Sequence, residues 1–522
     1  MAIAFNGKIC KMVALKRDLV KPESSKNYLY FQALEDNATI GFSAPTGSTT
    51  VDYEISIDGN SWSDWNSTTI GSVRVFDTIT LKTFGDYVMV RAKNETNSWT
   101  SNSSTGLRFD ISQGKVKAGG SVMSLKYKDP TDKTSVISQT YIFNNLFNGC
   151  ECLVYPPELP ATTLSSDCYH NMFFGCISLL IAPALPATTL ASSCYYGMFH
   201  GCTSLTTAPE LPATALAGSC YTEMFRGCTG LVAAPSVLPA SAMQQSCYQY
   251  MFDGCTSLTT APSILPASAM QNSCCAYMFQ GCKSLAVAPE LPATTLEYKC
   301  YYQMFQNCTS LAVAPELPAT TLAGSCYYSM FYGCASLTTA PSILPVTTLT
   351  SSCYYQMFYG CTSLTTAPEL PAKTLASNCY NGMFYGCISL ATAPELPATN
   401  LTNGNQCYQQ MFYGCTSLTM APELPATTLE SNCYDAMFRG CTSLTTAPEL
   451  PATTLTSQCY NSMFYGCTSL NYIKVGATSW NTSNASNWVY NVASSGSFYK
   501  PTGVSISAGS SGIPNGWTPF DY

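Results

Sequence analysis

One motif repeats along most of this chain and constrains its fold more than any other feature. It reads Cys-Tyr-x-x-Met-Phe-x-Gly-Cys-Thr-Ser-Leu-Thr-Thr-Ala-Pro-Glu-Leu-Pro-Ala-Thr-Thr-Leu and is almost intact from Cys353 to Leu375. Its second cysteine recurs from Cys150 to Cys467 at intervals of 26, 27 or 28 residues. A unit this short cannot bury its apolar side alone, so a tandem array predicts a solenoid in which each unit packs on the next.

The segments on either side of the repeat indicate further domains. Strand-like runs at 28–34, 38–42, 51–57, 73–76 and 87–93 are separated by turn residues, which is typical of a small antiparallel sandwich. A further strand is expected at 122–127. The predicted segments are an N-terminal arm (1–27), the sandwich (28–113), a linker and solenoid cap (114–140), the solenoid (141–470) and a small β-rich C-terminal cap (471–522).

The spacing of apolar residues in each unit predicts a short helix followed by a short strand. The apolar positions are i, i+1, i+4, i+5 and i+8, as in Cys353, Tyr354, Met357, Phe358 and Cys361. Ser352 is placed to cap this helix, and Gly360 to end it in a left-handed conformation. Only Asn307 replaces that glycine, and Asn tolerates the same backbone angles. The fold class expected is therefore α+β or β-rich, with a solenoid of about 12 units.

Cysteines are abundant, but their columns favour packing over disulfides or metal. The chain has 28, and 25 of them lie in two columns of the repeat. If Cys353 and Cys361 flank a helix, about 12 Å of helical rise separates them, beyond the roughly 7 Å limit for a disulfide. Bridges between neighbouring units stay open as an alternative. We favour buried, reduced thiols that act as small apolar residues.

Charge and composition exclude several function classes. Charged residues make up 10% of the chain and the net charge is −7, which argues against a nucleic-acid surface. No run is long and apolar enough to insert in a membrane, and no secretory signal is visible near Met1. The two histidines, His170 and His200, lie in different columns without a repeating acid–base partner. We therefore expect no enzyme and no cofactor.

Two outward columns are candidate sites. The column before the glycine varies from unit to unit and becomes a tyrosine stripe at Tyr332, Tyr359, Tyr385, Tyr413 and Tyr465. Exposed aligned aromatics suit sugars or protein contacts, although each ring could instead only cover its neighbour. A second column carries Glu369, Glu395, Glu423 and Glu449, about 5 Å apart if units stack at strand spacing. This row either binds Ca²⁺ or stays solvated.

The repeat resembles a known family. Cys-x-x-Leu-x-x-Ala-Pro-x-Leu-Pro together with Met-Phe-x-Gly-Cys, over residues 140–470, is similar to the Treponema-type, or BspA-like, leucine-rich repeat. The Thr-Thr-Ala-Pro-Glu-Leu-Pro variant resembles repeat proteins of gut Bacteroidales and of their phages. The resemblance implies a right-handed curved solenoid used for adhesion or for protein and glycan contacts, without catalysis.

The sequence therefore predicts a non-catalytic recognition protein. The leading hypothesis is a phage virion component, a tail fibre or capsid decoration, that contacts a glycan or protein of the host surface. Gly7-Lys-Ile-x-Lys-Met-Val resembles short N-terminal motifs of phage tail proteins, so residues 1–27 would dock on the virion. The alternative is a BspA-like adhesin on the bacterial cell surface.

Overall fold

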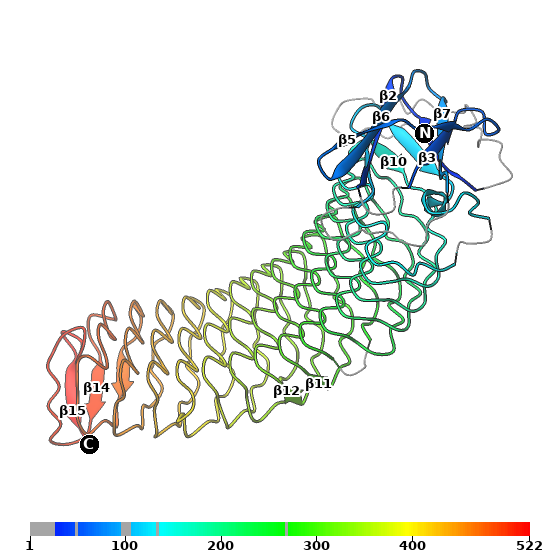
Figure 1. The fold of residues 1–522 in the computed structure, drawn as a ribbon. Helices are drawn as coiled ribbons and strands as arrows, with labels where there is room; N and C mark the ends of the chain where they lie inside the picture. Colours follow the sequence, from blue (N-terminus) through cyan, green and yellow to red (C-terminus); the bar gives the residue numbers. More distant parts are fainter. Residues whose placement is uncertain (1–26, 47–50, 95–105, 132–134, 267–269) are drawn as a thin grey trace.

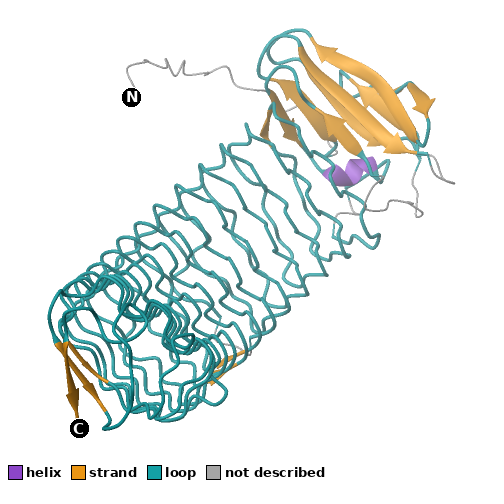
Figure 2. Cartoon of the chain, turned by 90° about the vertical axis from the view of Figure 1, so that its left-hand side faces the viewer, coloured by secondary structure: helices purple, strands orange, loops and turns teal. Residues whose placement is uncertain are grey.

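The chain forms a long, curved stack of coils with a β-domain on its N-terminal end (Figure 1). This computed structural model describes residues 27–46, 51–94, 106–131, 135–266 and 270–522. Each coil of the stack is one sequence repeat, and Figure 2 shows that the coils consist almost entirely of turns and loops. The chain is thus the β-rich repeat protein that its sequence predicts, with its C-terminus at the far end of the stack.

The N-terminal domain contains two sheets. All their strand pairs are antiparallel except β10 with β9. The larger sheet has the order β10 (Leu153–Tyr155), β9 (Val116–Gly119), β1 (Leu29–Ala33), β7 (Tyr87–Ala92), β3 (Tyr53–Ser56) and β4 (Ser63–Asp64). The smaller has the order β5 (Ser67–Ile70), β6 (Val73–Leu81), β2 (Ala38–Pro45) and β8 (Arg108–Asp110).

The two sheets and the first coil share one hydrophobic core. Phe42 of β2 packs edge-on against Tyr53 of β3, with ring centroids 5.0 Å apart. Phe109 of β8 stacks on Phe147 of the first coil at 5.2 Å, and Phe147 stacks on Phe173 of the second. Strand β10 itself belongs to the first coil and extends the larger sheet. The solenoid therefore continues the interior of the N-terminal domain.

The strand predicted at 122–127 is wrong. Residues Val122–Leu125 form a buried 3-10 helix, η1, and Ser121 caps it by accepting a hydrogen bond from the Met123 N–H. Ser124 donates to the carbonyl of Val90 and accepts from the N–H of Leu29, so η1 packs against β7 and β1. A four-residue apolar run fits either a strand or a short helix, and the Ser121 cap decides for the helix.

The helix predicted in each repeat is also wrong. In the stretch from Cys353 to Cys361, which we call the turn segment, backbone N–H groups alternate between two kinds of partner. Positions 354, 356, 358 and 360 donate to carbonyls of the next coil at 2.7–3.1 Å. Positions 355, 357, 359 and 361 donate to the carbonyl three residues earlier in their own coil at 3.1–3.3 Å. Half of the donors thus hold neighbouring coils together, which an α-helix cannot do.

A four-residue backbone period explains why the sequence resembles a helix. Positive φ recurs at Ser352 (54°), Gln356 (49°) and Gly360 (70°), so the chain turns every four residues. Two inward residues follow each of the first two turns, which gives the same i, i+1, i+4, i+5, i+8 pattern as a helical face. The left-handed conformation predicted for Gly360 is confirmed, and so is that of Asn307, with φ of 60°. Ser352 lies at a turn and caps no helix.

Two aromatic ladders fill the interior of the stack. The Phe of every Met-Phe pair is fully buried, and rings of successive coils lie parallel with centroids 5.4–5.7 Å apart. The Tyr that follows the first cysteine forms a second ladder, which Cys275 interrupts between Tyr248 and Tyr301. Each buried ring contributes about 2–3 kcal/mol by area, so these ladders dominate the stability of the array.

Both cysteine columns lie in the core, as predicted. Every cysteine of the two columns is buried, and none of those from Cys150 to Cys467 is in a disulfide. In the second column each thiol from Cys176 to Cys467 donates to a Phe carbonyl of the preceding coil at 2.9–3.1 Å, as Cys361 does to Phe331, and Cys150 donates to the carbonyl of Phe109 in β8 at 3.3 Å. The thiol therefore supplies both a small apolar group and a weak hydrogen-bond donor that joins two coils.

Few residues of the solenoid pair as regular strands. Between Leu364 and Leu370, and in equivalent stretches that we call Pro segments, neighbouring coils meet through single parallel bridges such as Thr339 with Thr366. The prolines of each Pro segment lack an N–H, so they limit the pairing between neighbouring coils to one or two residues. Two-residue strands form only at β11 (Thr295–Leu296) and β12 (Thr321–Leu322) among the described coils before residue 470.

The coil backbone continues beyond residue 470, where the cysteine motif ends. Phe464 donates its N–H to the carbonyl of Trp488, and the Trp488 ring stacks on Tyr460. A parallel sheet closes the stack: β13 (Tyr472–Lys474), β14 (Ser497–Lys500) and β15 (Thr518–Asp521). Pro519 of β15 presents no N–H at the outer edge, which discourages pairing with another strand.

Among the described residues, no helix is long and apolar enough to cross a membrane.

Replacing Gly386 tests the left-handed turn. A Cβ at Gly386 meets only Gly360 Cα at 3.9 Å, so the cost of Gly386→Ala comes from its φ of 69°. We expect Gly386→Ala to lower the free energy of unfolding by about 1–2 kcal/mol in urea melts followed by circular dichroism. Gly386→Asn, which installs the residue that Asn307 supplies in this column, is the control and should lower it by less. Equal losses would contradict a left-handed residue here.

The buried thiols make stability fall at alkaline pH. Burial raises the pKa of Cys334 to about 12 and holds that of Cys361 and Tyr354 well above their ordinary values. The unfolded thiols lose protons near pH 9 while the folded ones keep them, so the native state binds more protons and is destabilised as pH rises above 9. Each thiol contributes up to about 1.4 kcal/mol per pH unit. The melting temperature should be insensitive to the thiols below pH 8 and drop steeply from pH 9 to 11; a flat profile would contradict their burial.

Candidate functional site

The outward side chains of the turn segments form one continuous face of the solenoid. This turn face consists of the positions equivalent to 355, 356 and 359, because the positions between them point into the core. The coil-to-coil hydrogen bonds bring equivalent residues of successive coils next to one another. Each sequence column therefore becomes a row of side chains in contact.

The five tyrosines predicted as a stripe lie in one such row. Tyr332 stacks on Tyr359 at 4.6 Å, and Tyr359, Tyr385 and Tyr413 continue the stack at 4.3 Å per step, with planes within 7–11°. Arg439 then lies between rings, its guanidinium 5.5 Å from the Tyr413 centroid and 4.2 Å from that of Tyr465. The structure brings all five together in a single ladder, which we call the outer tyrosine ladder.

Stacking limits what this ladder can contact. Its rings are half-buried and cover one another's faces, so their edges and hydroxyl groups meet solvent. Burial, followed by the neighbouring phenols Tyr359 and Tyr413, raises the pKa of Tyr385. The Tyr385 hydroxyl therefore stays protonated at neutral pH and can both donate and accept hydrogen bonds. The ladder suits a polar, uncharged partner better than one that must stack on an open ring face.

A second aromatic ladder was missed in the sequence. Tyr302, Tyr328 and Tyr355 stack at 4.6 and 4.5 Å, and Tyr250 stacks on Tyr277 at 4.2 Å in the coils before them. Tyr277 and Tyr302 come from adjacent motif positions, and their rings meet at 5.2 Å and 54°. Aligning the two positions after the buried tyrosine would have revealed the individual runs. Only the structure shows that they join.

Polar residues elsewhere on the turn face also pair along the stack. Gln409 accepts a hydrogen bond from Asn381 and donates to Asp435, which also accepts from Asn461. Nearer the N-terminal domain, a charged cluster of His200, Glu223, Arg226 and Asp253 contains contacts of 3.3, 3.1 and 2.9 Å. His170 likewise lies 3.2 Å from Asp167, so each histidine has a carboxylate partner that the sequence did not reveal.

Burial and neighbouring charged groups shift the pKa values of Glu223, Asp253 and His170. The contact with His200, at 3.3 Å, is the main cause that lowers the pKa of Glu223. Burial raises the pKa of Asp253 despite the opposing charge of Arg226, and burial lowers that of His170. The cluster thus combines two carboxylates with one guanidinium across three coils. This arrangement links coils through charge and hydrogen bonding.

The predicted glutamate row lies on the Pro segments and is solvent-exposed. Glu369, Glu395, Glu423 and Glu449 occupy equivalent positions, and Glu449 pairs with Lys474 at 2.8 Å. The related Glu316 accepts hydrogen bonds from the N–H and hydroxyl of Ser342. Within the described ranges, no three acidic, histidine or cysteine side chains are grouped closely enough to hold a metal ion. The calcium hypothesis stays a prediction.

Comparison with known proteins identifies the repeat. The chain matches the family described as BspA type Leucine rich repeat region, with six copies, over residues 184–312, 218–365, 272–419, 325–447 and 356–492. Together these matches span residues 184–492, more than half of the chain, and they extend past the last cysteine motif.

One similar solved structure is a leucine-rich repeat protein from Eubacterium ventriosum. It is 14% identical, the alignment covers 66% of this chain and 93% of that chain, and the TM-score is 0.29. No curated protein matches this chain.

Proposed function

Because the chain belongs to the BspA-type leucine-rich repeat family, we propose that it is a non-catalytic recognition protein that binds a glycan or protein at a bacterial surface. Proteins of this family act in adhesion, and the solenoid offers a long, rigid surface for such contacts. The turn face is the proposed binding surface, with the outer tyrosine ladder at its centre.

The observation that carries this proposal is the contrast between the two sides of each turn segment. Inward positions carry Cys, Met and Phe in coil after coil, because these side chains fill the core and their rings stack on those of the next coil. Outward positions change from His200 through Arg226 and Gln280 to the tyrosines. A constant scaffold with a varied surface is the arrangement that recognition proteins use, because the surface can change without loss of the fold.

The outer tyrosine ladder gives this surface its chemistry. Its rings are stacked with centroids 4.3–4.6 Å apart, so their hydroxyls form a row several coils long. Such a row can hydrogen-bond to successive hydroxyls or amides of an extended chain, and the ring edges add apolar contact. Stacking holds the rings in place beforehand, so little side-chain entropy is lost on binding.

We place this activity on the bacterial cell surface, the setting that the family favours. The virion component predicted from the sequence depends on docking through residues 1–27. Of that segment only Asn27 belongs to the described residues, so the virion setting stays a prediction.

Substitution of the outer tyrosine ladder tests the binding surface. We expect Tyr359→Gln, Tyr385→Gln and Tyr413→Gln together to weaken binding to bacterial-surface glycans or to intact cells by at least about tenfold. The fold should persist, because Gln280 and Gln306 occupy the same column and pair with each other. Glu395→Gln with Glu423→Gln, on the Pro segments, is the control. Unchanged binding by the tyrosine variant, in a glycan array and a cell-adhesion assay, would reject the ladder as the site.

Antibody labelling distinguishes a location on the bacterial cell surface from a location on a phage virion. An antibody against the turn face should label intact bacteria that express this chain, because a cell-surface adhesin exposes its solenoid. Electron microscopy with gold-conjugated antibody measures this directly, and cells lacking the gene are the control. Label on purified phage particles without label on cells would establish the virion setting instead.

A further inference from the structure

The turn face carries no charged residue over six consecutive coils. These coils hold the turn segments that begin at Cys274, Cys300, Cys326, Cys353, Cys379 and Cys407. Their eighteen turn-face positions, from Ala276 to Tyr413, carry eight tyrosines, seven glutamines or asparagines, and one each of serine, alanine and glycine. Charged residues return at both ends, with Asp253 before this stretch and Arg439 after it. Since ion pairs such as Arg226 with Asp253 fit the same positions, the fold does not impose this neutrality.

The second aromatic ladder and the outer tyrosine ladder lie side by side in the middle of this stretch. In the second ladder, ring centroids lie 4.2–5.2 Å apart from one ring to the next, along Tyr250, Tyr277, Tyr302, Tyr328 and Tyr355. The outer ladder starts at Tyr332, so the coils of Cys326 and Cys353 carry one ring of each ladder. Burial raises the pKa of Tyr359, and the phenol of Tyr355 adds to this effect, so the two ladders are close enough to interact.

The rings of both ladders from Tyr277 to Tyr413 form one path along the stack, which we call the tyrosine track. Hydrogen bonds between coils bring equivalent residues of successive coils into contact, so the track follows the axis of the stack. Six coils at the spacing of neighbouring strands extend over roughly 25–30 Å. A partner that uses the whole track is therefore long, narrow and extended.

The side chains along the track both donate and accept hydrogen bonds without charge. Burial, followed by the neighbouring phenols, raises the pKa of Tyr277 and Tyr302 to about 12, so their hydroxyls stay protonated at neutral pH. Each phenol and each amide, such as those of Gln303 and Gln356, offers a donor and an acceptor. Lys299 borders the track, with its Nζ 5.0 Å from the centroid of the Tyr302 ring. A partner rich in hydroxyl groups matches this surface, whereas an ionic partner finds few opposite charges on it.

A peptide strand fits the track less well than a sugar chain does. Backbone N–H groups of the turn segments are already hydrogen-bonded, either to the next coil or three residues back, so they cannot pair with an added strand. A peptide strand presents side chains to one side about every 6.6 Å, whereas the stacked outer rings repeat every 4.3–4.6 Å. Sugar rings instead carry hydroxyls for the phenols and amides, and apolar C–H groups for the ring edges.

We propose that the tyrosine track binds one linear, uncharged polysaccharide, which lies along the stack and contacts both ladders. The partner of the proposed recognition function, on which this assignment rests, is thereby narrowed from a glycan or protein to one class of glycan. Tyr302, Tyr328 and Tyr355 of the second ladder become binding residues beside those of the outer ladder. The centre of the contact lies in the two coils that carry rings of both ladders.

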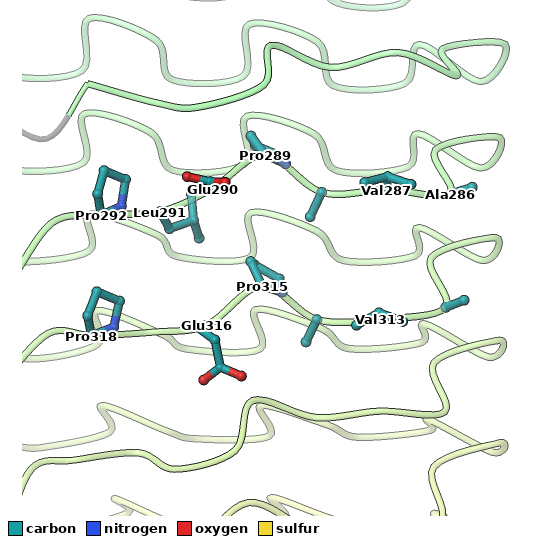
Figure 3. Close-up of a pocket in the computed structure, with 13 residues that line it drawn as sticks. Ala286, Val287, Pro289, Glu290, Leu291, Pro292, Val313, Pro315, Glu316 and Pro318 are labelled. Atoms are coloured by element: carbon teal, nitrogen blue, oxygen red, sulfur yellow. The ribbon is translucent and has the colours of Figure 1, made fainter.

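A groove on the Pro segments of the same coils provides a comparison surface. It has a volume of about 610 Å³ and lies between Ala286–Pro292 and Ala312–Pro318 (Figure 3). Apart from two glutamates, its lining consists of alanine, valine, leucine and proline. Such a lining has few groups that bond to sugar hydroxyls, so the polysaccharide should leave the groove free.

Binding of purified polysaccharide to matched variants tests the track. The probe is the neutral fraction, separated from acidic material by anion exchange, of the surface polysaccharide of bacteria to which the chain adheres. Tyr302→Gln, Tyr328→Gln and Tyr355→Gln together should weaken binding of this fraction by at least about tenfold in calorimetry. Gln249 and Gln409 occupy the same column, and Gln409 pairs with a neighbouring coil there, so the variant should fold. Circular dichroism checks the fold.

The groove supplies the matched control. Val287→Thr with Val313→Thr installs the residue that the following coils carry at this position, as at Thr339 and Thr366. This variant should bind the neutral fraction as the wild-type chain does. Loss of binding by this variant, with the track intact, would place the site in the groove and overturn the proposal.

Chain length gives an independent readout. Size-fractionated fragments of the same polysaccharide should gain affinity with length until they span roughly 25–30 Å, because shorter fragments cover only part of the track. Affinity that does not change with length would contradict an extended site.

The outcomes separate the track from the recognition function. If the second-ladder variant binds as the wild type does while the outer-ladder variant binds less, the track is overturned and the recognition function stands. Binding confined to acidic polysaccharide or to surface protein also overturns the track alone. Adhesion to cells that neither ladder variant changes, or no adhesion by the wild-type chain, overturns both.

Discussion

The hydrogen bonds that pass from every second residue of one turn segment to the next coil are the interaction on which this structure depends. They begin at Phe143, which donates to Cys168, and continue to Gly466, which donates to Tyr490. Because the intervening N–H groups bond three residues back, no donor of the turn segment needs water. The positive φ every four residues is the geometric condition for this alternation, and Gly or Asn supplies it at little cost where the coils come closest.

The hydrogen bonds between coils also determine how far apart equivalent side chains of successive coils lie. The Phe rings of the interior stack with centroids 5.4–5.7 Å apart, and the outer tyrosine rings stack more closely, at 4.3–4.6 Å. A column of identical charges would place them about 5 Å apart and repel by roughly 1–3 kcal/mol per pair. On the turn face, the alternation of Glu223, Arg226 and Asp253 avoids this repulsion. Stacked tyrosines and paired amides avoid the penalty, which is why they fill the turn face.

The two ends of the stack solve the problem of an open core in different ways. At the N-terminal end, Phe109 of β8 stacks on Phe147, so the β-domain continues the aromatic ladder. At the C-terminal end, Trp488 covers both the last Tyr and the last Phe of the ladders, and Pro519 removes a donor from the outer strand. The turn face therefore lies on a body that is closed at both ends and has one continuous interior.

The sequence by itself determined the solenoid, its period, the buried thiols and aromatics, the left-handed glycine column and the outward stripe of Tyr332 to Tyr465. Each of these follows from which residues recur at a fixed interval. Tertiary structure alone decided the backbone of the turn segment, because two inward residues in every four satisfy a helix and a turn that bonds to its neighbour equally well. It also decided that the outer tyrosines cover one another, that His200 meets Glu223, and that Val287 and Val313 share a groove, since these contacts join residues of different coils whose separation depends on how the coils stack.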